Sequence, residues 1–192
     1  MKVGLYFGTF NPIHVGHLIS ANHLAENSDL DQIWLVVTPQ SPFKKKQSLL
    51  DNYQRLEMVY RATKDYTNLY PSDIEFNLPQ PNYTINTLVH LEEKYPEKTF
   101  SLIMGEDNLK SFHKWKNYQL ILDNYDIYVY PRISEGQIET QFDGHEKIHH
   151  VKAPIIQLSS TFIRKAIKSG QNIRPMLPEH VWEYVDEMNF YK

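Results

Sequence analysis

The residues best suited to chemistry stand together near the amino terminus, in the run Gly8–His17 (GTFNPIHVGH). Gly8 and Gly16 allow the backbone to approach a ligand closely. We expect a helix to start here, and a helix start attracts phosphate through its unpaired N–H groups and positive dipole end. His14 and His17 are three residues apart, so they can share one face of the first helical turn. The run therefore predicts a phosphate-binding site.

Other interpretations of the two histidines stay open. They could be two ligands of a metal ion, but zinc needs three or four protein ligands and the chain contains no cysteine. We therefore expect no metal held by protein side chains. The histidines could also be ordinary surface residues beside a glycine turn that is merely structural.

A second group of hydroxyl and basic side chains stands near the carboxyl terminus: Ser159, Ser160, Thr161 and Arg164. Ser159 or Ser160 caps a predicted helix that runs to Ser169, and the start of this helix is a second phosphate-binding surface. Helical side chains lean toward the amino-terminal end, so Arg164 is expected to reach the same phosphate as Ser160. The alternative is an ordinary capped surface helix.

A basic loop, Pro39–Lys46, follows the second predicted strand. Lys44 and Lys45 could belong to a mobile loop whose positive charges bind the negatively charged phosphates of a triphosphate. The alternative is a solvated basic loop without a ligand.

The hydrophobic pattern places these groups at one edge of a parallel sheet. Val3–Phe7 reads as a buried strand, residues 15–26 as a helix and residues 32–38 as a second buried strand. This βαβ unit implies a right-handed parallel crossover, and ligands of such sheets bind beyond the carboxyl ends of the strands. Further strands are predicted over 69–76, 100–104 and 126–130, and further helices over 52–64, 84–95, 118–123 and 179–190.

These elements predict an α/β fold of the Rossmann-like, doubly wound kind. It would have a mainly parallel sheet of about five to six strands with helices on both faces. No linker, repeat or low-complexity tract divides the chain. Residues 1–192 are therefore expected to form a single domain, with a carboxyl-terminal helical part that begins near residue 159.

Several side chains outside the motifs carry expectations of their own. In the second predicted helix, Tyr60 is expected to point inward, and Arg55 and Arg61 to face solvent or a carboxylate. Asp73 and Glu75 share one face of the third predicted strand. They would form an acid–base or metal pair only if the end of that strand lay in the cleft.

Composition narrows the classes of function. The 192 residues carry a formal net charge of −3 with a pI of about 6.3, which implies no broad attraction to nucleic acid. The absence of cysteine excludes disulfides and thiolate chemistry. Val3–Phe7 is too short for the apolar part of a signal peptide, and no apolar run reaches the roughly 18–20 residues of a membrane span. We expect a cytoplasmic protein.

Both motifs resemble those of a known superfamily. The stretch His14–His17 (HVGH) resembles the (T/H)-x-G-H signature of the nucleotidyltransferases. Its longer form, Gly8–His17, is similar to that of the bacterial nicotinate-nucleotide adenylyltransferases. The stretch Ser159–Arg164 matches the superfamily's second signature, Ser-Ser-Thr-x-Ile-Arg, at every position. The resemblance extends from Val3 to the last predicted helix.

The resemblance implies transfer of the adenylyl group of ATP to nicotinate mononucleotide, which gives deamido-NAD and pyrophosphate in NAD biosynthesis, with Mg²⁺ carried on ATP. It assigns His14 and His17 to the ATP phosphates, with His17 near the α-phosphate. It assigns Lys44 or Lys45, together with Arg164, to the β- and γ-phosphates. Its ATP-binding positions are Gly8, Thr9, Phe10, Asn11, Gly16, Gly105, Asp107, Ser159, Ser160 and Thr161.

Further segments resemble the acceptor site of that family. The string Asn82–Leu88 is similar to the segment that contacts the nicotinate end of the substrate, and Trp115 follows Asp107 at the spacing of a stacking residue. The acceptor-binding residues implied are Tyr83, Thr84, Asn86, Thr87, Trp115 and Arg132. The chain departs from the pattern at Phe43, where the family often has histidine, so the lysine that aligns is left open, with Lys44 favoured and Lys45 next. It also departs at Glu106, where a small residue is commoner.

The chain carries no phosphate-binding P-loop and no Ser–His–Asp set, so direct attack of a substrate phosphate on ATP is the consistent mechanism. ATP and nicotinate mononucleotide are the expected partners, without nucleic acid or membrane, and the sequence is compatible with a homo-oligomer. One alternative is another adenylyltransferase of the same fold, such as pantetheine-phosphate adenylyltransferase, which Asn82–Leu88 disfavours. The other is a non-catalytic nucleotide-sensing module, which intact His14, His17 and Arg164 disfavour.

Overall fold

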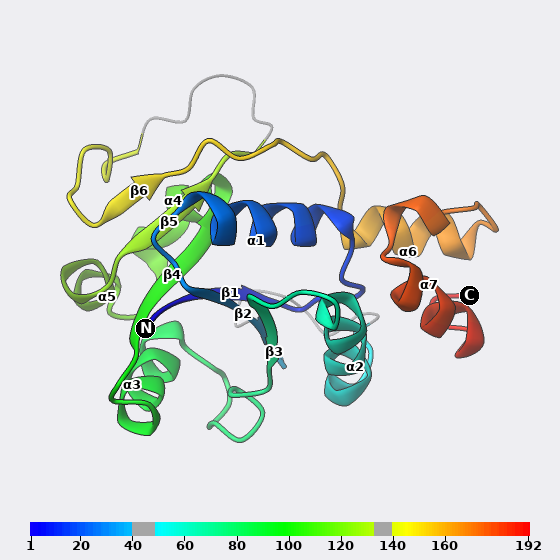
Figure 1. Cartoon of the computed structure of the whole chain (residues 1–192), viewed down its shortest axis with the longest axis horizontal. Helices are drawn as coiled ribbons and strands as arrows, with labels where there is room; N and C mark the ends of the chain where they lie inside the picture. The colour runs from blue at the N-terminus through cyan, green and yellow to red at the C-terminus, as the bar shows by residue number, and fades with distance from the viewer. Residues whose placement is uncertain (40–48, 133–139) are drawn as a thin grey trace.

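One parallel sheet organises the molecule in the computed structural model, which describes residues 1–39, 49–132 and 140–192 (Figure 1). Its strand order is β3-β2-β1-β4-β5-β6, and each neighbouring pair of these strands is parallel. The strands are β1 (Lys2–Gly8), β2 (Gln32–Val37), β3 (Leu69–Ser72), β4 (Thr99–Gly105), β5 (Ile127–Tyr130) and β6 (Ile148–His150). The order reverses between β1 and β4, and such folds bind their ligands outside the carboxyl ends at this point.

Helices cover both faces of the sheet, and Figure 1 shows α1 over one face and α3 over the other. The helices described are α1 (Val15–Asn27), α2 (Asn52–Thr63), α3 (Thr84–Lys94), α4 (Glu106–Ser111), α5 (Tyr118–Asn124), α6 (Ser160–Lys168) and α7 (Glu179–Glu187). Buried residues of α1, α2, α6 and α7 share one hydrophobic core, and those of α3, α4 and α5 share the other. The predicted doubly wound α/β fold is confirmed.

The alternation of side chains along β1 explains why the first strand reads as almost continuously apolar. Val3 and Leu5 point into the core beneath α3, whereas Tyr6 points into the core beneath α1. Each of these residues is buried, because helices cover both faces. The sequence pattern therefore reports the position of β1 at the centre of the sheet.

Three local expectations were wrong. The third strand ends at Ser72, and the chain then turns, with the Phe76 amide donating to the Asp73 carbonyl at 2.8 Å. Asp73 and Glu75 therefore share no strand face: Asp73 is exposed and Glu75 is buried. Tyr60 is 56% exposed instead of pointing inward. The last helix ends at Glu187, because the residues that follow include left-handed conformations.

Candidate active site

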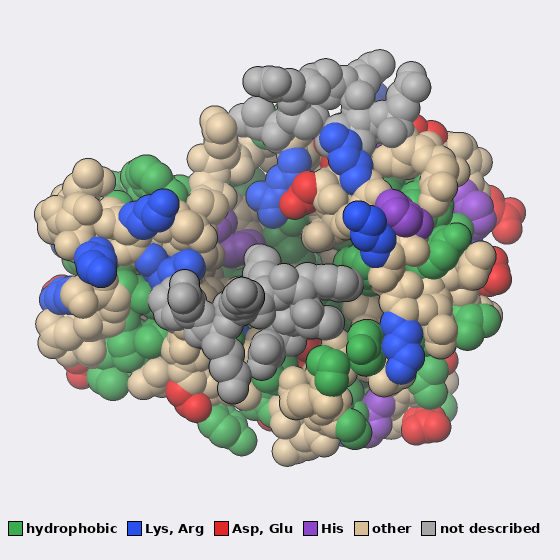
Figure 2. Space-filling model, turned by 180° about the vertical axis from the view of Figure 1, so that it is seen from behind, with side chains coloured by type: hydrophobic (Ala, Val, Ile, Leu, Met, Phe, Trp, Pro, Cys, Tyr) green, Lys and Arg blue, Asp and Glu red, His purple; other side chains and the backbone are tan. Residues whose placement is uncertain are grey.

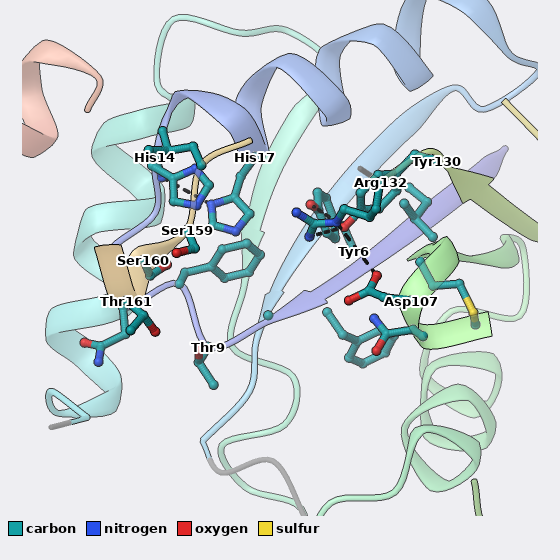
Figure 3. A pocket seen from close by; sticks show the side chains of 18 of the residues that line it. Tyr6, Thr9, His14, His17, Asp107, Tyr130, Arg132, Ser159, Ser160 and Thr161 are labelled. Atoms are coloured by element: carbon teal, nitrogen blue, oxygen red, sulfur yellow. Dashed lines mark hydrogen bonds and ion pairs between the residues drawn. The ribbon is translucent and has the colours of Figure 1, made fainter. Parts of the chain in front are cut away.

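A cleft of about 550 Å³ lies at the carboxyl edge of the sheet, between β1, β4 and the start of α6. Figure 2 shows a hollow on this side with a histidine side chain inside it and Lys and Arg side chains gathered around it. Figure 3 shows His14 and His17 on the same wall as Ser159, Ser160 and Thr161, with Arg132, Tyr130 and Asp107 facing them across the cleft. Residues from both predicted motifs therefore line one cavity.

The turn after β1 is shaped by an aromatic ring beneath it. Phe10 has φ of 44°, a left-handed conformation, and is 2% exposed. Its ring makes edge contacts with Tyr6 and His17. A Cβ atom added at Gly8 would lie 2.8 Å from this ring, so only glycine fits above Phe10. Packing against Phe10 is thus one reason for glycine at this position, and the close approach of its backbone to a ligand stays a prediction. Thr9 lines the cleft.

His14 and His17 form a stacked pair at the start of α1, with ring centroids 3.7 Å apart. The His14 backbone N–H donates to Nδ1 of His17 at 3.2 Å. A nitrogen that accepts carries no proton, so the neutral His17 ring carries its proton on Nε2. Gly16 allows this pair to pack, because a Cβ there would lie 3.1 Å from Nδ1 of His14.

Both imidazoles are held neutral. Burial lowers the pKa of His14 to about 4, and the nearby positive charge of Arg132 adds to this. Burial, His14 and Arg132 lower the pKa of His17 well below its ordinary value. At neutral pH the pair therefore presents an N–H donor to the cleft, and no cation.

Helix α6 is fastened directly to the turn of the first motif. The Ser159 hydroxyl caps the helix by accepting from the Phe162 amide at 3.2 Å. The Ser160 hydroxyl donates to the Pro12 carbonyl at 2.9 Å. Arg164 donates through Nη1 to the Asn11 carbonyl at 2.7 Å. The two motifs thus form one structure, although nearly the whole chain separates them.

Arg55 supports the turn of the first motif from beneath, whereas we expected it from the sequence to face solvent or a carboxylate. It is fully buried, and its hydrogen bonds within the described part of the chain go mainly to backbone carbonyls, with Asp51 acting on it only through its charge. Its guanidinium donates to the Thr9 carbonyl at 2.7 Å, the Thr38 carbonyl at 2.9 Å and the Leu50 carbonyl at 3.0 Å. Burial lowers the pKa of Arg55 to about 10. Its spacing from the buried Met58 and Val59 was a signal that it shares their face of α2.

Arg132 and Asp107 form the wall opposite the histidines. The Arg132 guanidinium donates to the Tyr130 hydroxyl at 3.0 Å, and its Nε lies 3.8 Å from Oδ1 of Asp107. A Cβ at Gly105 would lie 2.4 Å from that Asp107 oxygen, but the Asp107 side chain is 62% exposed and can move away, so this contact alone does not require glycine. Tyr6 and Tyr130 also line the cleft, and the sequence reading passed over both because they resemble ordinary core residues of strands.

The remaining candidates lie elsewhere or outside the described residues. Five of the acceptor-binding residues that the resemblance implies do not line this cleft. They are Tyr83, Thr84, Asn86, Thr87 and Trp115. Thr87 is buried and donates to Oε1 of Glu75 at 2.8 Å, and Trp115 packs against Phe112. Their roles stay predictions. Lys44 and Lys45 lie outside the described residues.

Within residues 1–39, 49–132 and 140–192, no group of three His, Asp or Glu side chains is arranged to hold a metal ion. Among those same residues, none of the helices has both the length and the apolar character needed to cross a bilayer.

Comparison with known proteins agrees with this geometry. The family model described as cytidylyltransferase-like matches residues 5–166. A protein of Flavobacterium psychrophilum, named "Probable nicotinate-nucleotide adenylyltransferase", is 67% identical over 192 residues, which is 100% of both chains. One of Christiangramia forsetii with the same name is 68% identical over 191 residues, 100% of this chain and 98% of its own.

A solved structure supports the fold independently. The Plasmodium falciparum nicotinic acid mononucleotide adenylyltransferase complexed with NaAD superposes with a TM-score of 0.81. The match covers 99% of this chain and 97% of that one at 17% identity, which compares folds alone. The family model and the similar proteins show that the chain belongs to the cytidylyltransferase-like family and, within it, to the nicotinate-nucleotide adenylyltransferases.

Proposed function

We propose that this protein transfers the adenylyl group of ATP to nicotinate mononucleotide and releases pyrophosphate, giving deamido-NAD for NAD biosynthesis. One observation carries the proposal. Helix α6 and the turn of Gly8–His17, the two predicted phosphate-binding elements, are joined by Ser160 and Arg164 at one end of a single cleft. The names of the relatives support the choice of substrates.

The chemistry is a displacement at the α-phosphorus of ATP. An oxygen of the acceptor's phosphate forms the new P–O bond, and the bond from the α-phosphorus to the bridging oxygen breaks, so pyrophosphate leaves with the electron pair. The attacking phosphate is already anionic and needs no general base. The protein must align two anions and stabilise the charge that grows on the α-phosphate.

The described residues supply donors for that charge. Nε2–H of His17 would donate to an α-phosphate oxygen, because Nδ1 is occupied by the His14 amide. The start of α6 and Arg164 would hold the β- and γ-phosphates, aided by Lys44 or Lys45. Mg²⁺ bound to ATP would neutralise the charge of the leaving pyrophosphate. Mg²⁺ keeps several of its water ligands and therefore needs few ligands from the protein. Asp107 carries the single carboxylate among the described residues that line the cleft.

The acceptor would begin at the wall of the cleft opposite α6 and extend beyond the cleft toward Trp115 and the start of α3. Arg132 would meet the phosphate of nicotinate mononucleotide, and Trp115 would stack on its pyridine ring. Helix α3 has no side-chain cap at its start, so the amide groups of Thr84 and Ile85 are suited to bind the nicotinate carboxylate. Tyr83, Asn86 and Thr87 would shape this end of the site. We also infer a cytoplasmic location from the substrates.

The proposal is tested by comparing nicotinate mononucleotide with nicotinamide mononucleotide under the same ATP and Mg²⁺. A carboxylate accepts from every donor at the start of α3, whereas an amide presents its own NH₂ to some of them. Each unmatched buried donor costs about 1–3 kcal/mol. We expect kcat/KM to favour nicotinate mononucleotide on the order of 100-fold. Equal values, or a preference for the amide, would overturn the acceptor assignment.

A screen of phosphate acceptors for pyrophosphate release from ATP separates this function from its alternatives. Release with phosphopantetheine in place of nicotinate mononucleotide would identify a different adenylyltransferase of the same fold. Failure of every acceptor to elicit release would identify a nucleotide-binding module without catalysis.

A further inference from the structure

The end of the chain returns to the first motif. After α7 the backbone turns through left-handed conformations at Asn189, with φ of 53°, and Tyr191, with φ of 67°. Phe190 is 7% exposed between them and packs edge-on against Tyr184 of α7. This turn brings the Tyr191 hydroxyl to Oδ1 of Asn11, to which it donates at 2.7 Å. The penultimate residue of the chain thus contacts the predicted ATP-binding turn.

Asn11 is held from several elements at once. Its Oδ1 accepts from Tyr191 and from the Leu50 amide, which lies 3.4 Å away. Its backbone carbonyl accepts from Arg164 at 2.7 Å. The residue is 3% exposed and lines the cleft. Donors from α6, from the approach to α2 and from the carboxyl terminus therefore converge on this one residue.

The Leu50 amide, which can only donate, fixes the orientation of the Asn11 side-chain amide. If that amide rotated by half a turn, its NH₂ group would face the Leu50 N–H, and two donors would oppose each other. The Tyr191 phenol keeps its proton at neutral pH, and burial raises its pKa further, although Arg164 and Arg55 nearby act in the opposite direction. The Leu50 N–H therefore selects one amide orientation in the wall of the cleft, and the Tyr191 hydroxyl adds a second, shorter hydrogen bond to the amide in that orientation.

We propose that Tyr191 is a positioning residue for ATP, which acts through Asn11. Its hydroxyl holds the Asn11 amide, and with it the turn between Thr9 and His14, in the conformation that receives the triphosphate. The inference rests on the proposed function only in taking ATP as the ligand of this cleft. It assigns a part in the site to the carboxyl-terminal tail, which the two sequence motifs do not include.

The test is the dissociation constant for Mg²⁺–ATP, measured by titration calorimetry on the full chain. Tyr191→Phe removes one hydroxyl and keeps the ring that packs beside Phe190. We expect ATP to bind about three- to tenfold more weakly, the usual effect of one neutral hydrogen bond. The KM for nicotinate mononucleotide should stay within about twofold, because the proposed acceptor wall lies across the cleft.

Tyr184→Phe is the matched control. Tyr184 lies on α7 beside the same Phe190, and its ring packs against the Arg61 guanidinium. Removal of its hydroxyl should leave ATP binding unchanged. A loss of ATP affinity in Tyr184→Phe equal to that in Tyr191→Phe would overturn the inference, because a general loosening of the tail would then explain both.

A double-mutant cycle separates action through Asn11 from other effects. In an Asn11→Ala background, Tyr191→Phe should change ATP binding less than about twofold. An undiminished effect in that background, or unchanged affinity in Tyr191→Phe alone, would overturn the inference. If the Tyr191→Phe loss is found in a protein that transfers no adenylyl group to nicotinate mononucleotide, the proposed function fails while the positioning role stands.

Discussion

At the scale of single residues, the cleft depends on a histidine pair kept free of charge. A neutral ring can donate without bringing a second cation beside Arg132, and the His14 amide selects the tautomer that donates from Nε2 of His17. The identity and spacing of the histidines were readable from the sequence. Their stacking and the direction of each nitrogen were not, because these depend on Phe10 and Tyr6 packed against the His17 ring.

His17→Ala should lower kcat by about 10²–10³ and change ATP binding much less. Loss of one hydrogen-bond donor that stabilises the negative charge of the transition state typically lowers kcat by about this factor. Steady-state kinetics with both substrates varied would measure it. His113→Ala is the control, because His113 is exposed and lies outside the cleft. A His17→Ala enzyme with near-normal kcat would contradict the assignment.

The pKa of His14 predicts an acid-sensitive fold. In the unfolded chain this histidine takes up a proton near pH 6.5, but in the folded protein only near pH 4. The unfolded state therefore binds more protons below pH 6.5, and stability is lost as the pH falls from 6.5 toward 4. At pH 5 this histidine should cost about 2 kcal/mol relative to pH 7.

Urea unfolding at pH 7 and pH 5 measures that loss. His14→Asn should lose less stability than the wild-type protein between the two pH values, because the substituted side chain does not titrate. His113→Asn should keep the full wild-type loss. If all three proteins respond equally to pH, His14 is not the group responsible.

At the scale of elements, the hydrophobic pattern of the sequence was sufficient to predict the position of a helix or strand wherever the element's own periodicity determines which face is buried. Helix α1 was expected over residues 15–26 and spans Val15–Asn27, and α2, expected over residues 52–64, spans Asn52–Thr63. The burial of a side chain could not be predicted where it depends on a hydrogen-bond partner that is distant along the chain. Arg55 is inside because it finds backbone carbonyls of Thr9 and Thr38, and one helix pattern cannot reveal such acceptors.

Arg55→Lys should destabilise the protein by at least about 2 kcal/mol, because a single ammonium group cannot reach the carbonyls that the guanidinium fork satisfies. The neighbouring Arg61 offers a matched control on the same helix. Arg61 is half-buried and pairs with Glu57 at 2.6 Å, so Arg61→Lys should cost less than about 1 kcal/mol. Urea unfolding of both variants measures the difference, and equal losses would contradict the structural role of Arg55.

At the scale of the whole molecule, the two edges of the sheet differ in character. The carboxyl edge carries the cleft, built from turns and helix starts. At the amino edge Lys2 is bound by Asp29 at 2.8 Å, Asp126 at 3.0 Å and the Tyr128 hydroxyl at 2.8 Å. The apolar runs and the strand–helix–strand order predicted which edge of the sheet would bind ligand. The meeting of α6 with the first turn was reached through the family resemblance, since no local pattern links segments so far apart.

This polarity predicts where ATP should slow hydrogen exchange. A ligand at 100 times its dissociation constant stabilises the state that binds it by about 2.7 kcal/mol. Openings local to the cleft should therefore become rarer at residues 9–20 and 159–167, whereas local openings at residues 27–31 and 147–150 should keep their rates. Short labelling times, with and without Mg²⁺ and a non-hydrolysable ATP analogue, isolate these local openings from global unfolding. Protection that appears equally at both edges, or only at the amino edge, would place the nucleotide outside the cleft that joins the two motifs.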